Sequence, residues 1–161
     1  MHGQSTQYLT VTASSFKGNV AAQDGGALHV ESQYVAITRS SLIANRANDG
    51  TGGAVSAKTP YLAASALFEE NSASISGGAI SYLLPPTLPP NSTTITIHLY
   101  NSSFIGNSAG DRGGAVFVPM MLGSQSNMIQ IYMNRLNASN NWLKKPAKIC
   151  QQEYSGASNT D

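Results

Sequence analysis

Residues 68–80 read FEENSASISGGAI: a large apolar residue, Asn three positions later, and then Gly-Gly-Ala followed by an aliphatic residue. The same pattern recurs along the chain. Its four copies place these residues at Phe16, Asn19, Gly25 and Gly26; at Leu42, Asn45, Gly52 and Gly53; at Phe68, Asn71, Gly77 and Gly78; and at Phe104, Asn107, Gly113 and Gly114. Self-similarity at a period of about 20 to 50 residues is typical of stacked repeat proteins. The pattern therefore predicts a solenoid in which each copy forms one coil.

The spacing of the copies identifies an insertion and a strand. The first two steps are 26 residues each and the third is 36, with the excess in residues 83–93, whose Pro-Pro-Thr-Leu-Pro-Pro indicates an inserted loop. Apolar residues seven and five positions ahead of the large apolar slot predict a strand with one buried face. These pairs are Leu9 and Val11, Val35 and Ile37, Tyr61 and Ala63, and Ile97 and Leu99; the residues expected to point outward between them are Thr10, Ala36, Leu62 and His98.

A fifth copy is decayed. The same rule finds Ile129 and Ile131 ahead of Leu136, but Ser139 stands where Asn is expected and no Gly-Gly-Ala follows. We therefore expect repeats over residues 1–139 and a C-terminal cap with a polar tail over 140–161.

Each consensus slot has a physical reason. In parallel strands stacked about 4.8 Å apart, equivalent residues form columns, and stacked Asn amides can hydrogen-bond in a ladder. The Gly-Gly pairs suit a corner that needs positive φ, or neighbouring backbones too close for a Cβ. A second short strand should follow each pair. Its inward residues would be Leu28 and Val30, Val55 and Ala57, Ile80 and Tyr82, and Val116 and Val118, with His29, Ser56, Ser81 and Phe117 facing solvent.

The paired elements resemble the short repeats of the chlamydial polymorphic outer-membrane proteins, Phe-x-x-Asn and Gly-Gly-Ala-(Ile/Leu/Val), over roughly residues 8–139. The resemblance implies an all-β, right-handed parallel β-helix of the pectin-lyase-like kind, with about four full coils and a decayed fifth. It also implies a non-enzymatic scaffold at the cell surface or outer membrane, either an autotransporter passenger or an adhesin. Its expected partner is a protein or glycan on a host or neighbouring cell, and no cofactor is expected.

Composition narrows the function classes. The net charge of +1 gives no basic field for nucleic acid, and no stretch reaches the ~20 apolar residues of a membrane-spanning helix. Met1–Thr10 lacks the features of a signal peptide, so either the protein is not exported by this route or the chain is a piece of a longer one. We expect the piece, because both ends of a β-helix need caps and only one end looks like a cap. Cys150 is the only cysteine and is expected to be an ordinary thiol. Asn91, Asn101 and Asn137 fit the glycosylation sequon.

The rival function is part of a carbohydrate-active β-helix enzyme of the pectin lyase or polygalacturonase kind. Glycoside hydrolysis needs two facing carboxylates, and neither outward column holds one, so no catalytic residue is predicted. The one acidic group worth weighing is Asp24, Asp49 and Asp111, which precede three Gly-Gly pairs and form a weak Ca²⁺ candidate. His29 and His98 occupy outward slots without zinc-ligand spacing. A carbohydrate-binding module would need a row of exposed aromatic residues, to which only Phe117, Leu62 and Tyr100 come near.

Overall fold

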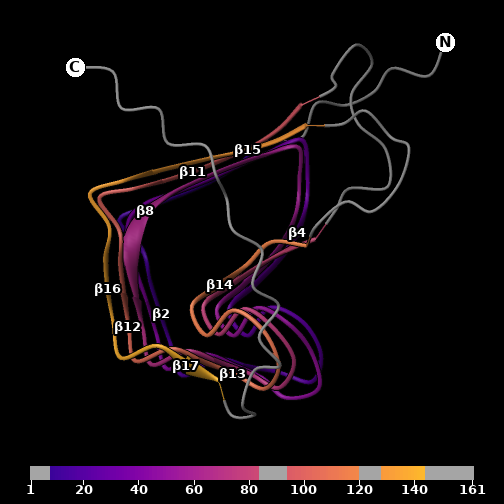
Figure 1. Cartoon of the computed structure of the whole chain (residues 1–161), viewed down its shortest axis with the longest axis vertical. Helices are drawn as coiled ribbons and strands as arrows, with labels where there is room; N and C mark the ends of the chain where they lie inside the picture. The colour runs from indigo at the N-terminus through magenta and orange to yellow at the C-terminus, as the bar shows by residue number, and fades with distance from the viewer. Residues whose placement is uncertain (1–7, 84–93, 120–127, 144–161) are drawn as a thin grey trace, which may run out of the picture.

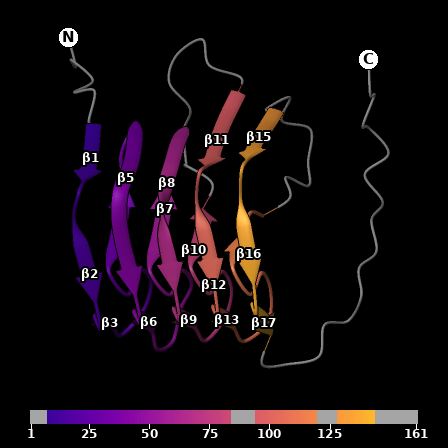
Figure 2. The ribbon, with the colours of Figure 1, turned by 90° about the vertical axis from the view of Figure 1, so that its left-hand side faces the viewer.

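The protein is a right-handed parallel β-helix. The computed structural model describes residues 8–83, 94–119 and 128–143, and these form strands joined by short bends, without a helix. All of their strand pairs are parallel and join one coil to the next. In Figure 1 the chain turns counter-clockwise while it advances toward the viewer from indigo to yellow, and Figure 2 shows the coils side by side in that order. The fold predicted from the repeats is confirmed.

Three sheets surround the core. The first contains β1 (Tyr8–Thr12), β5 (Tyr34–Ile43), β8 (Tyr61–Glu69), β11 (Thr94–Tyr100) and β15 (Met128–Asn134), together with β2 (Ser15–Lys17), β12 (Ser103–Ile105) and β16 (Asn137–Ser139). The second contains β4 (Leu28–Glu31), β7 (Val55–Lys58), β10 (Ile80–Leu83) and β14 (Val116–Phe117). The third contains β3 (Val20–Ala21), β6 (Arg46–Ala47), β9 (Ser72–Ala73), β13 (Ser108–Ala109) and β17 (Trp142–Leu143).

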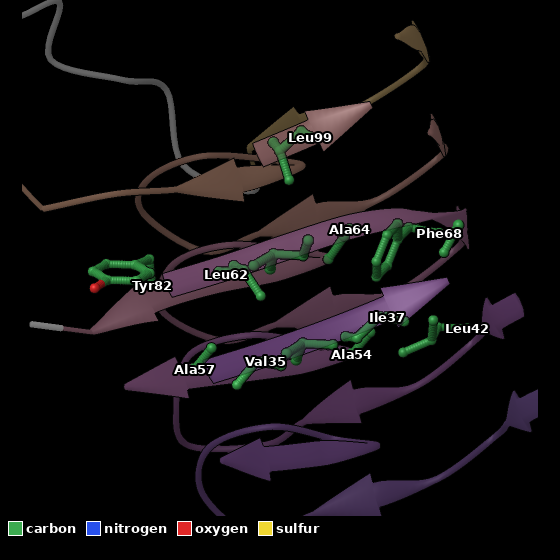
Figure 3. Close-up of a cluster of buried hydrophobic side chains, with 14 of the residues drawn as sticks. Val35, Ile37, Leu42, Ala54, Ala57, Leu62, Ala64, Phe68, Tyr82 and Leu99 are labelled. Atoms are coloured by element: carbon green, nitrogen blue, oxygen red, sulfur yellow. The ribbon is translucent and has the colours of Figure 1, made fainter. Parts of the chain in front are cut away.

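The core lies between the first and second sheets, where columns of apolar side chains meet. Leu62 and Ala64 of β8 and Tyr82 of β10 belong to one buried cluster, and Val35 and Ile37 of β5 lie in the coil below (Figure 3). The Phe68 and Phe104 rings stack with centroids 4.9 Å apart and an interplanar angle of 3°. Residues two apart in each strand thus share the buried face, as the period-two pattern predicts.

The Asn residues form one ladder through the stack. The Nδ2 of Asn45 donates to the Oδ1 of Asn71 at 3.0 Å, and Asn71 repeats this bond to Asn107. Each Oδ1 also accepts the backbone N–H of the preceding Asn, and each Nδ2 from Asn45 onward donates to the carbonyl of an apolar-slot residue, such as Leu42 for Asn71. Asn45, Asn71 and Asn107 are completely buried. The predicted column is confirmed.

The two glycines of each pair have different roles. Gly52 has a φ of 68°, in the left-handed region that favours glycine. Gly53 lies so close to the next coil that a Cβ would overlap the Gly78 carbonyl oxygen and the backbone of Ser72. The first glycine in every pair has positive φ and the second has this close approach, at Gly25 and Gly26, Gly77 and Gly78, and Gly113 and Gly114. Both reasons expected from the sequence therefore apply, one to each residue.

The third coil is one residue shorter than predicted. β5 and β8 pair with a register shift between Thr38 and Ser40, where Arg39 is an additional residue with a φ of 51°. The prediction that Tyr61 and Ala63 point inward is therefore wrong. Leu62 pairs with Val35 and is buried, and Ala64 pairs with Ile37.

The fifth coil is also shifted, by two residues. Ile97 pairs with Ile131, and Phe104 pairs with Ala138, so Leu136 does not occupy the large apolar slot. Asn141, and not Ser139, continues the ladder, because its Oδ1 accepts the Asn107 Nδ2 at 2.9 Å. The coil runs on through Leu143, where β17 pairs with β13, so the repeats extend past the predicted boundary at residue 139. A two-residue slip leaves the same face buried, so alternating apolar residues did not reveal it.

The second sheet differs from prediction on its outer face. His29, Ser56, Ser81 and Phe117 do stand in register, and His29 is exposed. Ser56 and Ser81, however, are completely buried, and their hydroxyl groups have no hydrogen-bond partner. The expectation that all of these slots face solvent is wrong.

The predicted inserted loop begins at Leu83, which ends β10; its other residues, 84–93, lie outside the described residues. The tail beyond Leu143 also lies outside them.

Candidate functional site

A row of aromatic rings crosses the outer face of the first sheet. The rings belong to Tyr8, Tyr34, Tyr61, His98 and Tyr132, one from each of the five coils. Successive ring centroids lie 5.6, 4.7, 5.4 and 4.6 Å apart. We call these five residues the aromatic row.

The row changes register between the third and fourth coils. His98 pairs with Ala63, two residues after Tyr61, yet its ring stacks on Tyr61. The Tyr61 ring therefore extends over the small Ala63 side chain, which is 5% exposed. Because Tyr34 and Tyr61 are almost parallel, at 9°, the inner rings cover each other's faces. The end rings, Tyr8 and Tyr132, remain 70% and 50% exposed.

Stacking places hydroxyl groups of different coils close together. The pKa of Tyr61 is raised above its usual value by burial, and further by the nearby Tyr34 and Tyr100 phenols. Loss of its proton would put a negative charge in a partly desolvated row, so the Tyr61 phenol stays neutral at physiological pH.

An open hollow of about 430 Å³ adjoins the end of the row. It is lined by residues at the bend between β15 and β16. This bend is at the upper left of Figure 1. Its lining comes from the fourth and fifth coils and comprises His98, Leu99, Tyr100, Asn101, Tyr132, Asn134 and Arg135. Asn101 and Arg135 both have positive φ, which turns the chain at this bend. Rings, amides and one guanidinium thus line one concave site, which combines aromatic surface with convergent polar groups as ligand sites do.

Sequence reasoning named His98 and Tyr100 but missed the row. The available signal was the recurrence of Tyr8, Tyr34 and Tyr61 at nearly the repeat period. The third coil lacks one residue between its strand and Phe68, so counting back from Phe68 placed Tyr61 in an inward position. The expectation that only Phe117, Leu62 and Tyr100 come near such a row is therefore wrong, because five rings line up on the outer face and the two end rings are exposed. Leu62, named as a candidate, is buried.

The acidic candidates are not brought together. The Asp24 Oδ1 accepts the Thr51 N–H at 2.6 Å and the Thr51 hydroxyl at 3.1 Å, so it stabilises the loop of the next coil. Asp111 pairs with the adjacent Arg112 at 3.3 Å, and Asp49 is exposed. Within residues 8–83, 94–119 and 128–143, no three Asp, Glu, His or Cys residues are grouped in a way that could hold a metal ion. The weak Ca²⁺ candidate finds no geometric support.

The remaining candidates are scattered. His29 lies on the outer face of the second sheet, whereas His98 belongs to the first sheet. Asn101 and Asn137 are exposed at the bend and on β16, whereas Asn91 and Cys150 lie outside the described residues. The part of the chain that the structure describes contains no apolar helix of membrane-spanning length.

The fold defines a class of protein: a parallel β-helix whose repeated residues hold the coils together. Comparison with known families then gives a more particular result. Residues 13–31, 65–82 and 101–119 match the Chlamydia polymorphic membrane protein repeat. No curated protein and no solved structure matched the chain. The chain therefore carries polymorphic membrane protein repeats, which confirms the resemblance seen in the sequence.

The three matches correspond to the first, third and fourth coils. The matches at 13–31 and 101–119 begin at the bends after β1 and β11, and the match at 65–82 begins within β8. All three run through the Asn and Gly-Gly positions into the second sheet. The second coil departs from the pattern, with Leu42 in the Phe slot and one more residue between Asn45 and Gly52. The fifth has Ala138 in that slot. The residues that define the family repeat are thus those that contact other coils.

Proposed function

We propose that this chain is part of a non-enzymatic cell-surface β-helix that mediates attachment to a host or neighbouring cell. The family repeat supports placement at the outer membrane or cell surface, as in an autotransporter-like protein. Repeat proteins commonly bind partners through the surface that a stacked scaffold presents.

One observation carries the attachment proposal: the repeat consensus and the outer surface use different residues. Phe68, Asn71 and Gly78 are buried between coils. The aromatic row and the hollow consist of residues outside the consensus. Such a division lets the surface change its chemistry while the scaffold keeps its stability, as in other folds that carry binding sites on a fixed framework.

The alternative is part of a carbohydrate-active β-helix enzyme. Its requirement is a pair of carboxylates facing a substrate. The acidic residues of the described first and second sheets are Glu31, which pairs with Lys58 at 3.2 Å, and Glu69. No arrangement among the described residues specifically favours this alternative.

Attachment can be tested with the purified protein immobilised on beads and added to cultured epithelial cells. We expect saturable binding that soluble protein displaces, with albumin-coated beads as the control. Bead binding that never exceeds the albumin control would contradict the proposal. In parallel, polygalacturonate should yield neither unsaturated nor reducing ends, with or without Ca²⁺. Turnover that Asp49→Ala abolishes would support the enzyme instead.

A further inference from the structure

The hollow beside Tyr132 has the chemistry of a site for an acidic sugar. Tyr132 is the last ring of the aromatic row within the described residues, and one of its faces stacks on His98 at 4.6 Å. Its hydroxyl group donates to the Gln130 Oε1 at 3.0 Å, which fixes the ring from a second side. A ring already held in place can bind a ligand with little loss of side-chain entropy. Half of the Tyr132 surface remains available for such a ligand.

Charge selects the ligand. Arg135 is exposed, and neither ion pair found in the described part of the chain includes it. The hollow's lining contains no carboxylate, so its only permanent charge is positive. A guanidinium group binds a carboxylate through two parallel hydrogen bonds. The ligand should therefore carry a carboxylate within reach of the Tyr132 ring.

Polar groups around the hollow fit a sugar better than a simple acid. The Asn101 and Asn134 amides each offer a donor and an acceptor, which suits hydroxyl groups. The flat apolar side of a pyranose ring matches an aromatic ring, while its hydroxyl groups need partners such as these. A free carboxylic acid would leave the ring and both amides unused.

We propose that this hollow binds a carboxylated sugar at the end of a glycan, with the sugar ring against Tyr132 and the carboxylate on Arg135. Uronic acids and sialic acids share this chemistry. The inference deepens the proposed attachment function and rests on it for its biological meaning, although binding itself can be measured independently.

The fold supplies a matched control for each residue. Arg39 occupies the same bend as Arg135, three coils earlier, with the same φ of 51°, but it does not line the hollow. Tyr8 is the exposed ring at the opposite end of the row. Arg39→Gln and Tyr8→Ala therefore remove the same groups as Arg135→Gln and Tyr132→Ala without touching the hollow.

The test is an NMR titration of the full chain with three ligands: a galacturonic acid oligomer, sialyllactose and neutral lactose. We expect one or both acidic sugars to shift the amide signals of Tyr132 and Arg135, but not that of Arg39, and lactose to bind at least about tenfold more weakly. Arg135→Gln should weaken the acidic sugar by about tenfold or more. Tyr132→Ala should weaken it as well, Tyr132→Phe much less, and neither control variant should matter.

Several outcomes would overturn the inference. These are equal binding of lactose and the acidic sugars, equal effects of Arg39→Gln and Arg135→Gln, or equally tight binding of an acidic peptide, which would indicate charge alone. Attachment of beads to cells without any sugar binding would refute this site but leave the proposed function standing. Sugar binding without attachment to cells would refute the proposed function but not the site.

Discussion

The side-chain amide of Asn45 donates to the Oδ1 of Asn71 at 3.0 Å, and the same oxygen accepts the Asn45 backbone N–H at 3.0 Å. One side chain therefore satisfies two buried donors of the preceding coil. Its own Nδ2 donates to Leu42 O at 2.8 Å and to Asn107. A buried polar group is tolerated only when its hydrogen bonds are made, and here they are made between coils. The ladder thus links three successive coils through each inner Asn.

Replacing Gly53 should be far more harmful than replacing Gly18. In Gly53→Ala the new Cβ would overlap the backbone of the next coil, and two coils would have to move apart. Gly18 has a φ of 66° but open space around its Cβ position, so Gly18→Ala should cost only about 1 kcal/mol of left-handed strain. Urea unfolding of both variants measures the difference. Similar losses would mean that the coils are less closely spaced than described.

Removing the Ser81 hydroxyl should not destabilise the protein. This group is completely buried and has no hydrogen-bond partner, so its desolvation is uncompensated. Ser81→Ala should leave the free energy of unfolding unchanged or raise it by about 1 kcal/mol. A chemical denaturation curve decides this, with His29→Ala, on the exposed slot of the same column, expected to change stability by less than about 0.5 kcal/mol. A loss above 1 kcal/mol in Ser81→Ala would indicate a partner for the hydroxyl, such as a bound water molecule.

Ala44→Gly should stabilise the protein. Ala44 is exposed, directly precedes a ladder Asn and has a φ of 54°. Gly18 and Gly106 occupy the same slot in the first and fourth coils. Relief of left-handed strain, about 1 to 2 kcal/mol, should exceed the additional chain entropy of glycine and leave a net gain of roughly 0.5 kcal/mol. Thermal unfolding measures the gain. Ala22→Gly, at an exposed site without positive φ, should instead lower stability.

Stability should fall in strongly alkaline solution because of Tyr82. Burial raises its pKa well above the usual value of 10.0, and its hydroxyl donates to the Thr59 carbonyl. A raised folded-state pKa gives stability that is complete below the unfolded pKa and is lost as pH rises from about 10 toward the folded pKa. Urea unfolding at pH 8 and pH 11 should therefore show a smaller free energy at pH 11. The decrease should be shallower in Tyr82→Phe; an equal decrease would assign it to other groups.

The repeat predicted most of the fold because each consensus residue serves one contact between coils. Asn71 and Gly53 could be understood from hydrogen bonding and close approach alone, and the structure places both as expected. The period of 26 residues also gave the columns directly.

The errors arose where a coil changes length. Nothing in the sequence marks the residue missing opposite Arg39, because an Ala-rich strand has nearly the same pattern in either register. In the fifth coil, a shift of two residues leaves the same face of the strand buried. The predicted inward pair, Ile129 and Ile131, therefore matched the apolar pattern as well as the observed pair, Ile131 and Met133. The Asn141 ladder position was the better guide, since only Asn can continue those bonds.

The candidate site was harder to predict because it lies outside the repeat. The aromatic row depends on side chains that reach across register, from Tyr61 to His98. The acidic residues near the Gly-Gly pairs occupy similar positions in the sequence, but the structure gives them different partners. Asp24 binds the backbone of the next coil, and Asp111 pairs with its own neighbour.

Unfolding of Asn71→Ala, compared with Asn19→Ala, tests most directly whether the Asn ladder holds the coils together. Asn71 is buried in the middle of the ladder, whereas Asn19 is exposed at its first position and donates one side-chain bond, at 2.9 Å. Asn71→Ala leaves the Asn45 donors and the Leu42 carbonyl unpaired, so it should cost about 3 kcal/mol or more, or prevent folding. Asn19→Ala should cost about 1 kcal/mol. Equal, small losses for the two variants in urea would contradict a structural role for the ladder.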